Sequence, residues 1–207
     1  MIKLVVFDLW DTLAYRGTGY GSTAHLMKMT NSRLPREKFI KIFEKSLQTK
    51  KWRSKHAAYM DFCKNLGLPA TRANIEMLVK TRDRAESRAK IFFYSIRMLK
   101  KLRKQGYKTG MISNTSIFAI QKIMMKTKLL DHIDYFLPSY SARMIKPDPR
   151  IFKKMLGVAK VEPREAIMVG DKINDDVLPA RRMGMHAIHF TNYNELRKRF
   201  MNFKIHL

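Results

Sequence analysis

The stretch of sequence that decides the fold is Lys3-Leu4-Val5-Val6-Phe7-Asp8-Leu9-Trp10-Asp11-Thr12-Leu13. Its first part, residues 3–7, is an apolar run rich in β-branched side chains, which is typical of a strand buried in a parallel sheet. Asp8 follows directly and places a carboxylate at the predicted carboxyl end of this strand. Because ligands of open α/β sheets bind beyond the carboxyl ends of the strands, the stretch predicts a buried strand with a polar site at its end.

Beyond residue 90 the chain alternates between predicted helices and predicted strands. Strands are expected at 107–113, 135–137, 166–169 and 186–190, and helices at 96–105, 117–128, 149–157 and 176–183. Such alternation predicts a parallel sheet with right-handed crossovers, covered by helices on both faces. The fold class is therefore α/β, with a Rossmann-like doubly wound core.

Between the first strand and this alternating region the sequence shows only helical periods. Phe39, Phe43 and Leu47 mark one apolar face, and Tyr59 and Phe62 mark another. No strand signal appears from about residue 17 to residue 90. We therefore expect a helical subdomain inserted into the α/β core.

Polar residues fall at the predicted carboxyl ends of several strands. Asp8 follows the first, Ser113 closes the second, and Asp171 follows a later one, while Lys146 lies in a predicted loop. These positions are far apart in sequence, yet a parallel sheet would bring them to one edge. Their convergence is a stronger signal than any single motif.

Four segments together resemble the motifs of the haloacid dehalogenase-like (HAD) hydrolase superfamily. They are Phe7-Asp8-Leu9-Trp10-Asp11-Thr12-Leu13, Ile112-Ser113-Asn114, Lys146-Pro147-Asp148-Pro149, and Val169-Gly170-Asp171 with Asp175-Asp176. Their order and spacing fit that family over residues 1–14 and roughly 92–190. The resemblance implies a core domain at 1–14 and 91–207 and a helical cap at 15–90.

The resemblance also implies a magnesium-dependent phosphatase with a nucleophilic aspartate. Asp8 would attack phosphorus and form an aspartyl-phosphate, while Ser113 and Lys146 would stabilise the transferring oxygens. Mg²⁺, a hard cation that prefers oxygen ligands, would be held by Asp8, Asp171 and the backbone carbonyl of Trp10. The substrate would be a small phosphorylated anion.

Three further residues are assigned supporting positions. Asp176 would complete or orient the magnesium shell, although an aspartate there could also cap the following helix. Thr12 would hold the geometry of the loop after the first strand. Asn114 is interpreted as a turn residue with a backbone role.

Trp10 departs from the pattern of the family's phosphatases. Those enzymes carry at this position an aspartate that protonates the leaving group and later activates water, and indole can do neither. Asp11 lies one position further on, and a neighbouring loop residue generally points elsewhere. The sequence therefore predicts a preference for leaving groups that need no proton.

Two alternatives stay open. The family's dehalogenases also lack that aspartate and often carry an aromatic residue there, because a halide leaves without a proton, but they need no metal and lack the equivalent of Asp171. The second alternative is a weakly active or non-catalytic relative that binds acidic partners such as nucleic acid. The aromatic run Phe92-Phe93-Tyr94 could stack on bases, although its position favours packing.

Composition limits the remaining possibilities. The 42 Lys and Arg against 17 Asp and Glu give a net charge of +25, which favours anionic partners and non-specific binding to nucleic acid. No segment is long and apolar enough to span a membrane. The single cysteine, Cys63, excludes an internal disulfide and agrees with a cytoplasmic location. Oligomeric state is not indicated.

Overall fold

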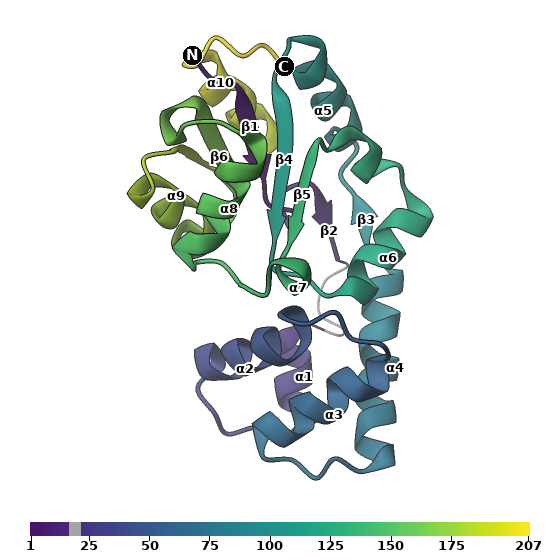
Figure 1. Ribbon diagram of the computed structural model, residues 1–207. Helices are drawn as coiled ribbons and strands as arrows, with labels where there is room; N and C mark the ends of the chain where they lie inside the picture. The colour runs from purple at the N-terminus through teal and green to yellow at the C-terminus, as the bar shows by residue number, and fades with distance from the viewer. Residues whose placement is uncertain (17–21) are drawn as a thin grey trace.

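Five parallel strands form the central sheet of the molecule (Figure 1). The computed structural model describes residues 1–16 and 22–207. Across the sheet the strand order is β5-β4-β1-β6-β7, with β1 in the middle and buried along its whole length. The strands are β1 (Leu4–Phe7), β4 (Lys108–Ser113), β5 (Tyr135–Pro138), β6 (Ala166–Gly170) and β7 (His186–His189).

Helices cover both faces of this sheet, as expected for a doubly wound fold. On one face, α5 (Ser95–Lys104), α6 (Ile117–Lys126) and α10 (Tyr193–Met201) pack in the cluster that contains Val5 and Phe7. On the other face, α8 (Pro149–Ala159) and α9 (Leu178–Arg182) pack in the cluster that contains Leu4 and Val6. The side chains of β1 alternate between the two clusters because successive strand residues point to opposite faces. The predicted Rossmann-like α/β class is confirmed.

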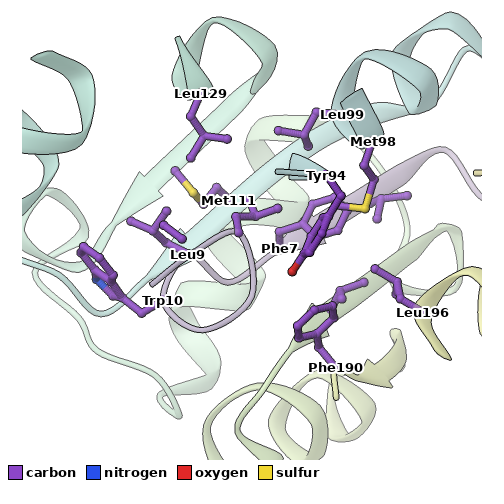
Figure 2. Packing of buried hydrophobic residues seen from close by; sticks show 14 of the residues in the cluster. Phe7, Leu9, Trp10, Tyr94, Met98, Leu99, Met111, Leu129, Phe190 and Leu196 are labelled. Atoms are coloured by element: carbon purple, nitrogen blue, oxygen red, sulfur yellow. The ribbon is translucent and has the colours of Figure 1, made fainter. Parts of the chain in front are cut away.

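Tyr94 ties the start of α5 to the loop after β1 (Figure 2). Its ring stacks on Tyr193 with centroids 4.5 Å apart, and its hydroxyl donates a 2.9 Å hydrogen bond to the Thr12 carbonyl. Phe92 stacks on Tyr94 as well, whereas the Phe93 side chain is exposed. Phe92 and Tyr94 therefore pack within the core, which is the interpretation that the sequence favoured over stacking on bases.

In the described residues 22–87, four helices follow β1 and pack on one another as a separate cluster. They are α1 (Thr23–Met29), α2 (Arg36–Gln48), α3 (Lys55–Leu66) and α4 (Arg72–Ser87), and we call them the helical segment. Ser54 and Thr71 cap the starts of α3 and α4 through their hydroxyls, and Gly67 ends α3 in the left-handed conformation, which glycine adopts without strain. Phe62 lies at the centre, edge-on to Phe39 and Phe43.

A short antiparallel ribbon joins the helical segment to the sheet. Its strands are β2 (Ala14–Tyr15) and β3 (Lys90–Ile91), and Tyr15 pairs with Lys90. The expectation that no strand occurs up to residue 90 was therefore wrong at its edge, since a two-residue strand is too short to show a period. The domain boundaries at 14/15 and 90/91 fall inside this ribbon and stay a prediction.

The second half of the core contains several short elements besides the main helices. They are α7 (Ser139–Ala142), the 3₁₀ turns Leu129–His132 and Pro163–Glu165, and the π-helical turn Ile173–Val177. The helix predicted at 176–183 thus begins as a π turn, which a sequence period of 3.6 does not distinguish. Within residues 1–16 and 22–207, no helix has the length and apolar character that crossing a membrane requires.

Candidate active site

The structure brings the four predicted segments together at the carboxyl edge of the sheet. Asp8 follows β1, Ser113 ends β4 and Asp171 follows β6. Because β4 and β6 are the two neighbours of β1, these three residues come from adjacent strands. Lys146 reaches the same place from the loop between α7 and α8.

A buried ion triad forms the floor of the site. The Lys146 ammonium lies 2.8 Å from Asp8 Oδ1 and 2.5 Å from Asp176 Oδ1. All three side chains are buried, and Asp176 is completely inaccessible. Buried charges persist only when they are paired and hydrogen-bonded, so the triad holds Asp8 in one fixed orientation.

Burial and charge act in opposite directions on the pKa values of these groups. Burial raises the pKa of Asp8, and the adjacent Lys146 opposes that rise. For Lys146, burial alone would lower the pKa, but Asp8 and Asp176 together raise it. Lys146 is therefore firmly cationic. It favours the ionised carboxylate that a nucleophile requires.

Asp171 completes a cluster of carboxylates that suits a divalent cation. One ligand atom each from Asp8, Asp171 and Asp176 lies within 4.8 Å of the others. Asp171 Oδ1 is buried and has no hydrogen-bond partner among the described residues. Burial, together with Asp8 and Asp176, raises the pKa of Asp171 to about 7. With all three carboxylates ionised, the cluster around the Lys146 ammonium has a formal charge of −2. A set of carboxylate oxygens with this charge fits Mg²⁺.

Gly170 and the π turn position Asp176. A Cβ atom on Gly170 would lie 2.3 Å from Asp176 Oδ2, so only glycine admits the carboxylate there. The backbone N–H of Lys172 donates to the same oxygen at 3.1 Å. Both carboxylate oxygens of Asp176 are therefore engaged, one by Lys146 and one by this N–H, which orients the group toward the triad.

The two hydroxyls predicted for the site are buried and uncommitted. Within the described part of the chain, neither Ser113 Oγ nor Thr12 Oγ1 has a hydrogen-bond partner. A buried hydroxyl without a partner costs free energy unless a ligand completes it. Ser113, at the end of β4, is thus available to donate to a bound oxygen.

Asn114 does more than form a turn. Its side-chain Nδ2 donates to the Lys146 carbonyl at 3.0 Å, and its Oδ1 accepts from the Lys146 backbone N–H at 2.8 Å. This pair of hydrogen bonds fixes the backbone of the loop that carries the ammonium. The sequence indicated a backbone role but not the partner, because the two residues are distant along the chain.

The Trp10 side chain is buried and contacts both Thr115 and Arg16. Its Nε1 donates to Thr115 Oγ1 at 3.3 Å, and the Arg16 guanidinium carbon lies 3.4 Å from the centroid of its ring. Asp11 is exposed and takes a left-handed backbone with φ of 59°, which aspartate tolerates better than most residues. Arg16 carried no sequence signal, because its place depends on the chain's path out of β2.

The sequence of the predicted cap offers Tyr15, Tyr20, His25 and His56 as further candidates for contact with a substrate. The three that the structure describes lie in different places. Tyr15 packs on Phe92 with ring centroids 4.8 Å apart. His56 lines an outer groove between α3 and α4 with Lys80 and Glu76. His25 lies half-buried in α1, and Tyr20 falls outside the described residues.

Among the proteins similar to this chain are a phosphatase and a structurally characterised HAD family enzyme. A glyceraldehyde 3-phosphate phosphatase from Pyrococcus furiosus is 36% identical over 44% of this chain and 38% of its own length, so the chain spans well under half of that relative. A HAD family enzyme from Bacteroides thetaiotaomicron, solved in complex with magnesium and inorganic phosphate, aligns with a TM-score of 0.68 at 22% identity, covering 95% of this chain and 99% of its own.

A third similarity shows that the fold alone does not select the chemistry. A 2-haloacid dehalogenase from Pseudomonas syringae pv. Tomato aligns with a TM-score of 0.60 at 22% identity, over 94% of this chain and 90% of its own.

The match at the level of the family covers most of the chain. A family model described as haloacid dehalogenase-like hydrolase matches residues 2–184. That span contains Asp8, the end of β4 at Ser113, the loop with Lys146 and the Asp171–Asp176 segment. The motifs, the sheet order and this match agree, and the chain belongs to the haloacid dehalogenase-like hydrolases.

Proposed function

We propose that this hydrolase is a magnesium-dependent phosphatase that acts through an aspartyl-phosphate on Asp8. The observation that carries the proposal is the buried Asp8–Lys146–Asp176 triad beside Asp171, whose Oδ1 has no partner among the described residues. A phosphatase name on the Pyrococcus furiosus relative supports it. The expected substrate is a small phosphorylated anion.

In this proposal each group has a distinct role. Asp8 Oδ attacks phosphorus, so an acyl-phosphate bond forms while the bond to the ester oxygen breaks. Lys146 balances negative charge on Asp8 and on the phosphoryl oxygens, and Ser113 Oγ donates a hydrogen bond to one of those oxygens. Water then hydrolyses the aspartyl-phosphate and regenerates Asp8.

The residues that would hold magnesium are Asp8, Asp171 and the Trp10 carbonyl, with Asp176 orienting the shell. Bound there, the cation would offset charge on the phosphoryl group. The unpartnered Asp171 Oδ1 supports this assignment. The magnesium complex of the Bacteroides thetaiotaomicron enzyme also supports it.

The carboxylate cluster weighs against dehalogenation. A halide leaves as an anion and needs neither a proton nor a metal, so three carboxylates within 4.8 Å would only repel the charge that develops. Non-specific binding to nucleic acid stays a prediction that rests on the charge of +25. A cytoplasmic location also stays a prediction, supported by the buried free thiol of Cys63.

The site is tested by metal binding and by turnover together. Magnesium should raise the melting temperature of the unaltered protein, and Asp171→Ala should abolish that gain. A screen of phosphate esters and acyl phosphates should show magnesium-dependent hydrolysis that Asp8→Asn lacks. Equal stabilisation of Asp171→Ala by magnesium would show that the metal site is wrong, and equal hydrolysis by Asp8→Asn would reject the nucleophile.

A further inference from the structure

Helix α2 presents two different faces. Phe39, Phe43 and Leu47 are buried in the cluster of the helical segment. Glu44 and Gln48, one turn apart, share a face that is directed at the core. Gln48 is 5% exposed and lines a narrow cavity with Ser116 and Phe118 of the core.

This face lies against the carboxyl edge of the sheet. Helix α2 contacts α7, which directly follows β5, and Figure 1 shows the two helices next to each other. Gln48 Oε1 is buried without a hydrogen-bond partner in the part of the chain that the structure describes. Gln48 thus brings a buried polar atom to the junction between the helical segment and α6, and α2 itself lies next to the edge of the sheet.

Glu44 is the ionisable member of this face. Its carboxyl interacts with the side-chain amide of Asn114 and is close enough to Lys172, Asp175 and Lys146 to feel their charges. Asn114 in turn holds the backbone of Lys146. Burial raises the pKa of Glu44, and the charge of Lys172 opposes that rise. A carboxyl group from the helical segment thus lies beside Asn114 and Lys172, at the margin of the site.

The Glu44 carboxyl is placed where a group could protonate the leaving oxygen, the step for which Trp10 offers no acid. In phosphoryl transfer the attacking and leaving oxygens lie roughly in line, so the leaving group departs on the side away from Asp8. Asp8 comes from the core sheet, and α2 of the helical segment lies beyond the carboxyl edge of that sheet, next to α7 (Figure 1). The departing group would therefore face α2. Trp10 occupies the position where the family's phosphatases carry an acid. Its side chain instead donates a hydrogen bond to Thr115 and packs under the Arg16 guanidinium.

We propose that Glu44 is the general acid and base of this site, a role that rests on the proposed phosphatase function. In the first step the protonated Glu44 carboxyl gives its proton to the ester oxygen, which leaves as an alcohol while Asp8 takes the phosphoryl group. In the second step the Glu44 carboxylate takes a proton from water, whose oxygen attacks phosphorus. Phosphate leaves, Asp8 is regenerated and Glu44 is protonated again.

Leaving-group dependence tests this role. Glu44→Gln should hydrolyse ethyl phosphate about 10² to 10⁴ times more slowly than the unaltered protein, the usual contribution of a general acid or base. With 4-nitrophenyl phosphate it should release one equivalent of nitrophenolate per protein at nearly the original rate, because this anion needs no proton. Steady turnover should then be slow, since the second step lacks its base.

The control is Glu37→Gln, which changes an exposed glutamate on the same helix and should leave both substrates unaffected. If Glu44→Gln slows the nitrophenolate burst as much as ethyl phosphate hydrolysis, Glu44 only supports the structure. Unchanged hydrolysis of ethyl phosphate by Glu44→Gln would reject the role and leave Asp11 as the next residue to alter. An unaltered protein no more active than Asp8→Asn would overturn the phosphatase function and this role with it.

Discussion

Gly170 leaves the space that the Asp176 side chain occupies. A methyl group there would lie 2.3 Å from Asp176 Oδ2 and 2.4 Å from its Cγ, so the carboxylate of Gly170→Ala must move away from Lys146. We expect a loss of about 1–3 kcal/mol in the free energy of unfolding, typical of overpacking. Denaturant unfolding measures that loss, and phosphatase activity should fall with it.

The matched control is Gly157→Ala in α8. A Cβ atom there meets nothing within 4 Å, and replacing a helical glycine with alanine stabilises by about 0.5–1 kcal/mol. Its activity should equal that of the unaltered protein. Should Gly170→Ala unfold at the same denaturant concentration as the parent, Asp176 is not confined as described.

Single residues differ in how well the sequence predicts them. Asp8, Ser113 and Asp171 were readable because each stands at the end of an apolar strand, and parallel strands bring such ends together. Glu44 and Arg16 carried no signal, since their positions depend on how the helical segment packs on the core. A local pattern cannot report contacts between side chains so distant along the chain.

At the scale of elements, Phe62 tests how far the helical segment and the metal site are independent. Its fully buried ring is edge-on to three others, at centroid distances of 5.7 Å, 5.7 Å and 6.2 Å. Phe62→Ala should cost about 3–5 kcal/mol and reduce turnover, because α2 loses its support. Stabilisation by magnesium should persist, since the carboxylates lie in the core.

Thermal melts with and without magnesium measure both effects. Phe62→Leu provides a milder change if the alanine variant does not fold, and Met60→Ala, on the same helix with Met60 41% exposed, should alter neither quantity. Loss of the magnesium effect in Phe62→Leu would show that the two parts are coupled.

Elements were predicted unevenly as well. The five strands of the sheet were all expected, each with one end shifted by a single residue, because buried apolar runs are easy to recognise. The β2–β3 ribbon was missed. Asp176 and Val177, the last two residues of the π turn at Ile173–Val177, were taken for the start of an ordinary helix. The ribbon is set by tertiary contacts, namely the pairing of Ala14 with Ile91 and of Tyr15 with Lys90.

For the whole molecule, the charge of +25 has a measurable consequence. A strongly cationic protein attracts anions, and salt screens that attraction over a Debye length. Raising the ionic strength from about 50 mM to about 500 mM should lower kcat/KM for a phosphate ester by about tenfold, while kcat stays constant. If kcat/KM does not change with salt, the positive charge of the protein does not attract the substrate to the active site.

The sheet order also bears on how the chain acquires its structure during synthesis. The middle strand β1 comes first in sequence, yet Leu4 pairs with Lys108 on one side and with Ala166 on the other. A ribosome therefore exposes β1 long before it makes either neighbouring strand, whereas the helices α1–α4 are synthesised before β4 and β6 and can already contact one another. We therefore expect hydrolytic activity only from the late nascent chain, because Asp8 lacks Lys146, Asp171 and Asp176 as neighbours until the second half has emerged.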